Sequence, residues 1–258
     1  METGAITGYI DVAQLVLYAF WIFFAGLIIY LRREDKREGY PLESERAAHV
    51  TVQGFPGVPE PKTFLLRDGH TVQSPRKEAA ETDIKAKPAA PFPGSPLIPE
   101  GDGVGAGVGP GAFANRADEP DKTYDGRARI VPMRSVSEAE VDRRDADPRG
   151  MDLVGADGEV AGTIKDLWLD LSEPHVRYLE AEVGGATGPR RILVPIYFAK
   201  VNGGRGQVKV QALKGHQLAH VPGTANPDLV TLLEEERIMG YFGSGTLYAD
   251  PVRQEPLI

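Results

Sequence analysis

The sequence contains no cysteine, which excludes disulfide frameworks, cysteine-ligated zinc, iron–sulfur clusters and cysteine nucleophiles. No Lys or Arg precedes Arg32, although 29 of the 258 residues are basic. The 37 acidic residues bring the net charge to −8, so no nucleic acid partner is expected. A chain of this length holds one or two domains.

One long apolar run stands near the N-terminus. Residues 12–31 contain no charged side chain, and Gln14 is their only strongly polar residue. Twenty helical residues cover about 30 Å, which is the thickness of the hydrocarbon core of a bilayer. Because the backbone must satisfy its own hydrogen bonds in lipid, the run predicts a single transmembrane helix.

The charges around this run predict its orientation. Arg32, Arg33, Lys36 and Arg37 follow it at once, and basic residues are retained on the cytoplasmic side. Residues 1–11 are therefore expected to form an extracytoplasmic tail. The alternative, a cleaved secretory signal peptide, needs a basic segment before the apolar run.

Proline and glycine dominate the next part of the chain. Residues 32–130 are predicted to form an extended cytoplasmic segment, with one short edge strand near residues 63–66. Residues 86–120 are the richest in both residue types and cannot bury a core of their own. They are interpreted either as a disordered linker or as a strap laid over a partner.

From residue 131 to residue 258 the composition is that of a packed β domain. Residues 154–160 carry Asp157-Gly158 between two apolar runs, which is a hairpin signal. Residues 179–183 and 208–212 alternate apolar and polar side chains, as half-buried strands do. Residues 192–196 contain Pro195 and predict an edge strand. Asn226-Pro227-Asp228 predicts the start of one helix ending before Gly240, beside a small barrel or sandwich.

No catalytic signature is recognisable in the sequence. His216 and His220 have the spacing of one helical face, but no third metal ligand is identifiable near them. Acidic residues gather in two places, at residues 118–125 and around the turn at residues 170–177. They form either a solvated acidic face or, if held close together near a guanidinium, a proton relay.

Short motifs along nearly the whole chain resemble the H subunits of the photosynthetic reaction centres of purple bacteria. The matching segments are residues 11–15 (DVAQL), 30–42 (YLRREDKREGYPL), 61–64 (PKTF), 107–110 (GVGP), 130–133 (IVPM), 147–150 (DPRG), 162–170 (GTIKDLWLD), 177–180 (RYLE), 232–235 (LLEE) and 240–241 (GY).

The resemblance implies a mainly β fold in which one transmembrane helix precedes a cytoplasmic PRC-barrel domain. It implies a non-catalytic subunit that caps the L and M subunits in the photosynthetic (chromatophore) inner membrane, stabilises the quinone region and assists proton transfer to the secondary quinone. The chain itself is then expected to bind no cofactor. Bacteriochlorophyll, bacteriopheophytin, quinones, non-haem iron and carotenoid belong to partner subunits, and a cytochrome subunit and a light-harvesting 1 antenna ring are further partners that the resemblance leaves open.

The resemblance also assigns roles to individual residues. Asp170, Glu173 and Arg177 correspond to the family's polar cluster below the secondary quinone, and Asp125 corresponds to an acid where protons are taken up. Some family members carry two histidines just after that acid, whereas this chain has Arg127 and Arg129 there. Asp118 and Asp121 are expected to serve instead. An anionic lipid headgroup is expected at Tyr30, Arg32, Arg33 and Lys62.

A second function stays open at this point. A PRC-barrel tethered to the membrane is also compatible with an adaptor that recruits some other cytoplasmic protein. A membrane-bound hydrolase is a remote third reading, because no pair of nucleophile and base can be named.

Overall fold

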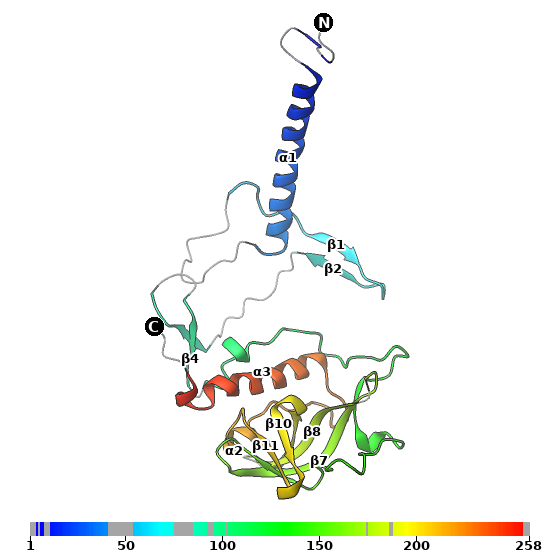
Figure 1. The fold of residues 1–258 in the computed structure, drawn as a ribbon, viewed down its shortest axis with the longest axis vertical. Helices are drawn as coiled ribbons and strands as arrows, with labels where there is room; N and C mark the ends of the chain where they lie inside the picture. The colour runs from blue at the N-terminus through cyan, green and yellow to red at the C-terminus, as the bar shows by residue number, and fades with distance from the viewer. Residues whose placement is uncertain are drawn as a thin grey trace. The chain divides into compact units, whose positions relative to one another are not determined.

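The computed structural model describes residues 4, 6–7, 11–40, 54–74, 85–91, 95–101, 103–173, 175–185 and 188–254 (Figure 1). Most of the expected tail at residues 1–11 lies outside them. The chain divides into two compact units, residues 1–82 with 91–95, and residues 83–90 with 96–258. Residues 96–130, which the sequence analysis placed before the β domain, belong to the second unit.

The first unit contains the long helix α1 (Val12–Arg37). Its N-terminus is capped by Asp11, whose Oδ1 accepts a hydrogen bond from the backbone N of Gln14 at 2.7 Å, while Gln14 Oε1 accepts from Asp11 N. The one polar side chain of the apolar run therefore has a capping role. The helix is long and apolar enough to cross a membrane, as predicted. It continues to Arg37 because residues 32–37 are good helix formers.

The C-terminal end of α1 is bonded to the chain that follows it. Arg37 is buried and donates to Glu34, to the carbonyl of Glu60 and to the carbonyl of Ser74. These contacts join the helix to a hairpin of β1 (Lys62–Leu65) and β2 (Thr71–Ser74). The short strand expected near residues 63–66 is confirmed as β1. Its partner β2 was missed, because four mostly polar residues carry little strand signal.

Arg37→Met should loosen this hairpin while leaving the apolar part of α1 intact. Methionine keeps much of the aliphatic stem but removes the charged donors, and hydrogen bonds from charged groups are the stronger ones. Amide hydrogen exchange over residues 62–74, measured on the detergent-solubilised chain, should be about tenfold faster. Arg33→Met is the matched control, because Arg33 is exposed and has no ion pair among the described residues. Equal exchange in both variants would contradict the docking role of Arg37.

The second unit is built on a seven-stranded sheet that curls round a core (Figure 1). The strand order is β10-β11-β6-β7-β8-β9, with β5 paired to β7. Only β11 and β6 pair in parallel, and β9 pairs with β8 alone, so the predicted edge strand is confirmed. The strands are β5 (Ile130–Pro132), β6 (Asp152–Val154), β7 (Val160–Asp170), β8 (His175–Gly185), β9 (Gly188–Pro195), β10 (Ala199–Asn202) and β11 (Gln207–Val210).

The hairpin predicted at residues 154–160 joins β6 to β7, and Gly158 takes the positive φ of +87° that its turn requires. The predicted alternation in β8 holds for Leu179, Ala181 and Val183, which are all buried. It fails at Glu180, which was expected to face solvent but is only 2% exposed. Burial of its carboxylate is compensated by charged and polar donors.

Three side chains hold the Glu180 carboxylate. Arg134 Nη1 donates to Glu180 Oε2 at 2.7 Å, Trp168 Nε1 donates to the same oxygen at 2.9 Å, and Arg191 Nη1 lies 2.9 Å from Oε1. Arg134 also bonds Asp166 and Asp228. Both faces of β8 are therefore covered at Glu180. An alternation of apolar and polar residues in the sequence cannot reveal this.

Part of the proline- and glycine-rich segment of residues 86–120 packs on the C-terminal helix of the same chain. Val104 and Val108 are buried, and the 3₁₀ turn at Gly109–Gly111 lies on the helix. A Cβ added at Gly111 would lie 2.8 Å from Ser244 Cβ, so only glycine permits this approach. Part of the segment therefore packs against another part of the chain, as a strap would, but its support is α3 of the same molecule. Its other regular elements are β3 (Ala86–Pro88) and β4 (Leu97–Pro99).

The C-terminal helix begins and ends later than predicted. Helix α3 (Leu232–Tyr248) starts after Thr231, whose Oγ1 accepts from Glu234 N at 3.2 Å. Asn226 instead forms a turn, with Oδ1 accepting from Asp228 N at 2.8 Å. The helix runs through Gly240 because this glycine gives close contact to the carbonyl of Gly111. Among the described residues, the remaining helices are α2 (Gly215–Leu218) and 3₁₀ turns at Met133–Ser135, Ile196–Phe198, Gly203–Arg205 and Pro251–Arg253.

Candidate functional site

Asp170, at the end of β7, forms the most buried contact among the predicted site residues. Its side chain is fully buried, and Arg129 approaches it with Nε 3.0 Å from each carboxylate oxygen and Nη2 2.8 Å from Oδ2. Backbone amides of Ser172 and Glu173 donate to Oδ1 at 2.9 and 3.2 Å. Burial alone would raise the pKa of Asp170, but the Arg129 and backbone hydrogen bonds outweigh it and hold that pKa below its usual range.

Two more predicted acids surround the same guanidinium. Asp121 Oδ2 lies 3.3 Å from Arg129 Nη1, and Glu173 Oε1 lies 3.9 Å from Arg129 Nη2. Hydrogen bonding to Asp170 raises the pKa of Arg129, so it stays charged. Glu173 is 70% exposed and Asp121 39%, so two solvent-accessible carboxylates flank one buried carboxylate. Sequence reasoning noted Arg129 only as part of a departure from the family pattern, and nothing in its spacing pointed to Asp170.

Arg177 lines a different pocket from Asp170. It lines a pocket of about 320 Å³ between β8 and α3, together with Tyr178, Glu235 and Glu236. Sequence reasoning had grouped Arg177 with Asp170 and Glu173 around one turn. The β7–β8 pairing shifts register between Trp168 and Leu169. Because of this shift, side chains do not simply alternate between the two faces of β8 from the turn to Arg177. The face on which Arg177 lies could therefore not be counted off from the turn.

Glu235 is the main site residue that sequence reasoning missed. Tyr178 Oη donates to Glu235 Oε2 at 2.7 Å, and Tyr178 is only 3% exposed. Burial raises the pKa of Glu235, and the charge of Asp121 raises it further, while the Tyr178 hydrogen bond and Arg177 oppose this without cancelling it. The available signal was the helical spacing of Leu232, Glu235 and Met239, which places the carboxyl on a partly buried face.

The other two predicted acids have partners outside the Arg129 cluster. Asp118 Oδ1 accepts from Thr231 Oγ1 at 2.7 Å, which places it at the start of α3. Asp125 accepts from Thr123 Oγ1 at 2.6 Å and from Arg127 Nε at 2.7 Å. The Thr123 hydrogen bond is the largest of several contacts that lower the pKa of Asp125. Asp125 thus lies within its own turn and is linked to its sequence neighbours.

The four predicted lipid contacts lie in the first unit. Tyr30 is exposed, and Arg33 has no ion pair among the described residues. Arg32 Nη1 lies 3.4 Å from Asp35 Oδ2, and Lys62 Nζ lies 2.9 Å from Glu34 Oε1. Two of the three basic groups are therefore partly neutralised within the chain.

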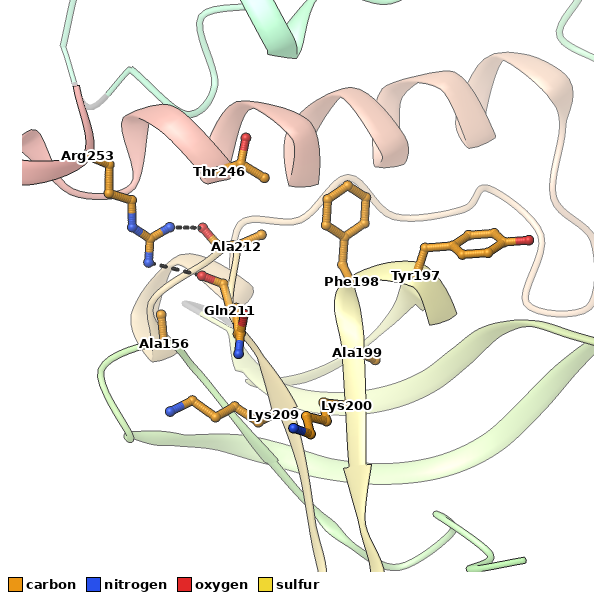
Figure 2. Close-up of a pocket in the computed structure, with 10 residues that line it drawn as sticks. All are labelled: Ala156, Tyr197, Phe198, Ala199, Lys200, Lys209, Gln211, Ala212, Thr246 and Arg253. Carbon is orange, nitrogen blue, oxygen red and sulfur yellow. Dashed lines mark hydrogen bonds between the residues drawn. The ribbon is translucent and has the colours of Figure 1, made fainter. Parts of the chain in front are cut away.

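A pocket of about 650 Å³ between α3 and the β10–β11 hairpin has a different character (Figure 2). Arg253 reaches across it and donates to the carbonyls of Ala212 and Gln211, both at 3.0 Å. Lys200 and Lys209, which are register partners, line the same pocket. Its charged side chains are all basic, so it offers no carboxyl that could carry a proton.

One group of side chains has the composition of a metal site. Ligand atoms of Asp157, Glu159 and His216 all lie within 4.8 Å of one another on the exposed surface. They could hold a divalent ion through two carboxylates and one imidazole. His220 lies beyond the single turn of α2, so the structure pairs His216 with residues other than the one its spacing suggested.

The fold, an apolar helix long enough to span a membrane followed by a curled β sheet, is that of a membrane-anchored β protein. Residues 140–217 match the PRC-barrel domain family. Residues 4–135 match the family described as the photosynthetic reaction centre, H-chain N-terminal region. The second match covers just over half of the chain, and the chain belongs to the photosynthetic reaction centre H-chain family.

This membership confirms the resemblance found in the sequence. It makes the chain an H subunit, a structural subunit associated with a reaction centre complex and anchored in a membrane. The PRC-barrel match alone would equally fit the adaptor alternative. The match over residues 4–135 decides between them, because it covers the membrane helix and the segment that follows it.

Proposed function

We propose that this H subunit caps the L and M subunits on the cytoplasmic side, stabilises the quinone region and assists proton transfer to the secondary quinone. The basic residues after the apolar run support an N-terminus in the periplasm and a β domain in the cytoplasm. In this proposal the pigments, quinones, iron and carotenoid belong to L and M. The chain is non-catalytic, and its residues move protons while electrons pass over the partners' cofactors.

The arrangement around Arg129 is the observation that carries the proton-transfer role. A proton crosses a low-dielectric region only by passing between titratable groups and waters. Glu173 and Asp121 offer exposed carboxylates for proton uptake, and Arg129 fixes both near the buried Asp170.

Glu235 supplies a second kind of carboxyl. Its raised pKa lets it hold a proton closer to neutral pH than Asp170 can. Asp121 influences its charge, so the Arg129 cluster and the Glu235 pocket act on each other electrostatically. Carboxyls with pKa values pushed apart are suited to passing a proton in steps.

At the membrane surface, we propose that Tyr30 and Arg33 contact an anionic lipid headgroup. Arg33 carries the charge with no carboxylate partner among the described residues, while Arg32 and Lys62 contribute more weakly because of Asp35 and Glu34. A basic group beside an anionic bilayer contributes about 1 kcal/mol.

Glu173→Gln tests the proton-transfer role. The variant keeps the shape of the side chain but cannot release a proton. In the intact complex it should slow proton uptake at the second electron transfer to the secondary quinone, with initial charge separation unchanged. Flash-induced absorbance with a pH indicator measures both. Glu100→Gln is the control, an exposed acid elsewhere in the same unit. An unaltered uptake rate for Glu173→Gln would remove Glu173 from the pathway.

A further inference from the structure

A pocket of about 600 Å³ lies where the segment of residues 136–148 crosses the sheet. Its floor is apolar and incompletely covered, since several of its aliphatic side chains are only half-buried. These are Val136, Val141, Leu169, Leu171, Val176, Ile196 and Val201. A volume of this size is typical of pockets that receive a ligand or a side chain.

The charged residues that line this pocket are all acidic. Asp142 is paired with Arg144, and Asp170 is paired with Arg129. Glu138, Glu140 and Asp145 are exposed and have no ion pair among the described residues. The lining contains no Lys or Arg. Arg143 and Arg149 line the neighbouring hollow at the outer side of the same segment.

His175 is one of the residues that line this pocket, and one of its ring nitrogens is buried. His175 Nδ1 lies 2.6 Å from the carbonyl oxygen of Glu173, and a carbonyl only accepts, so Nδ1 carries the proton. Nε2 of the neutral ring is then an acceptor. It is buried and has no hydrogen-bond partner among the described residues. A buried acceptor without a donor is costly, so the pocket is incomplete as the chain stands alone.

We propose that this pocket, which we call the acidic pocket, receives a segment of another reaction-centre subunit that presents a Lys or Arg beside apolar side chains. The inference rests on the proposed function and names one contact within it. The aliphatic stem of a Lys or Arg matches the apolar floor, and its charged end supplies the donors that the acids and His175 lack.

The position of the acids favours a polypeptide segment over a free small molecule. Glu138, Glu140 and Asp145 are exposed at the rim, whereas Leu169 and Val176 at the floor are half-buried. An occupant that contacts both must extend from the floor to the solvent-facing rim. A side chain carried on a partner's backbone does this, while its neighbours cover the half-buried aliphatic residues.

Photo-crosslinking of the full-length chain in its assembled complex tests the contact. Val141 is replaced by p-benzoylphenylalanine in cells that make the whole complex, and crosslinked peptides are identified by mass spectrometry. The expected product joins position 141 to a segment of another reaction-centre subunit with a Lys or Arg within about three residues. The same replacement at Val160, which is 59% exposed on the β6–β7 hairpin, is the control and should not give this product. Crosslinks only to lipid, to a small molecule or to a segment without Lys or Arg overturn the proposal.

Charge reversal gives an independent readout. Glu140→Lys should reduce retention of the chain by the pigmented complex about tenfold at physiological salt, whereas Glu100→Lys, a control at an exposed position outside the pocket, should leave it unchanged. Replacing the crosslinked Lys or Arg by Glu should restore retention of Glu140→Lys. Normal retention of Glu140→Lys overturns the acidic pocket alone. Absence of the wild-type chain from the pigmented complex overturns the proposed function as well.

Discussion

Glu235→Gln is expected to slow proton uptake at the second electron transfer to the secondary quinone about a hundredfold, the lower end of the range typical of a positioned proton-transfer group. Glutamine preserves the size of the side chain and can keep a hydrogen bond to Tyr178. It cannot accept and release a proton, so the loss isolates that function. The rate is measured by flash-induced absorbance changes in the assembled complex.

The raised pKa of Glu235 predicts how the effect of this substitution changes with pH. The pKa of Glu235 lies above its ordinary value of 4.5, so its protonated fraction falls as pH rises through the raised value. The contribution of Glu235 should therefore diminish above that pH, and Glu235→Gln should lack this step in its pH–rate profile. Because a raised carboxyl pKa lowers folding stability above the ordinary pKa, the variant should be no less stable than the wild type at neutral pH.

Glu236→Gln is the matched control for Glu235→Gln. Glu236 is the next residue of α3 and lines the same pocket, but its Oε1 contacts Arg116 at 3.5 Å at the exposed rim. It should leave the uptake rate nearly unchanged. Equal slowing in both variants would indicate a general electrostatic effect of the pocket and would contradict a specific role of Glu235.

Asp170→Ala is expected to lower the free energy of unfolding by about 2–3 kcal/mol, because it leaves Arg129 without its bidentate partner. Two backbone amides also lose their acceptor. This loss is smaller than is typical when a fully buried ion pair is broken, because Arg129 is 29% exposed and keeps its contact with Asp121. Urea unfolding of the detergent-solubilised chain, followed by tryptophan fluorescence, measures it, because Trp168 lies in the core.

The pH dependence of this stability runs opposite to that at Glu235. The folded-state pKa of Asp170 is lowered from 3.8, so its contribution is fully present above pH 3.8 and is lost as pH falls through the folded value. The difference between wild type and Asp170→Ala should shrink below pH 3.8. Asp125→Ala is the control, an exposed acid held within its own turn, and should unfold like the wild type. Equal destabilisation by both variants would contradict a special role of the buried pair.

Local patterns in the sequence predicted much of the fold. The apolar run at residues 12–31, the Asp157-Gly158 turn and the alternation in β8 each depend on near neighbours. The first two are confirmed, and the alternation is confirmed except at Glu180. The predicted start of α3 was wrong, because Asn226-Pro227 is equally suited to a turn. The helix is capped instead at Thr231, where Glu234 completes the capping box. Local signals of equal strength cannot be separated without the surrounding chain.

The candidate functional site was harder to predict than the fold, because it depends on contacts between residues that lie far apart in the sequence. Arg129 and Asp170 are 41 positions apart, and Tyr178 and Glu235 are 57 apart. Glu180 was expected in solvent because its strand alternates, yet Arg134 and Arg191 cover it from other elements. The proton-transfer roles of the acids remain predictions.

The most direct test of the proposed role measures proton uptake in the complex with and without this chain. The subunit is stripped from the purified reaction centre, and uptake after a second flash is compared before removal, after removal and after adding the chain back. Slower uptake after removal, restored by the wild-type chain but only partly by Glu173→Gln or Glu235→Gln, is the predicted result. An identical uptake rate in all three preparations would contradict the role proposed for this H subunit.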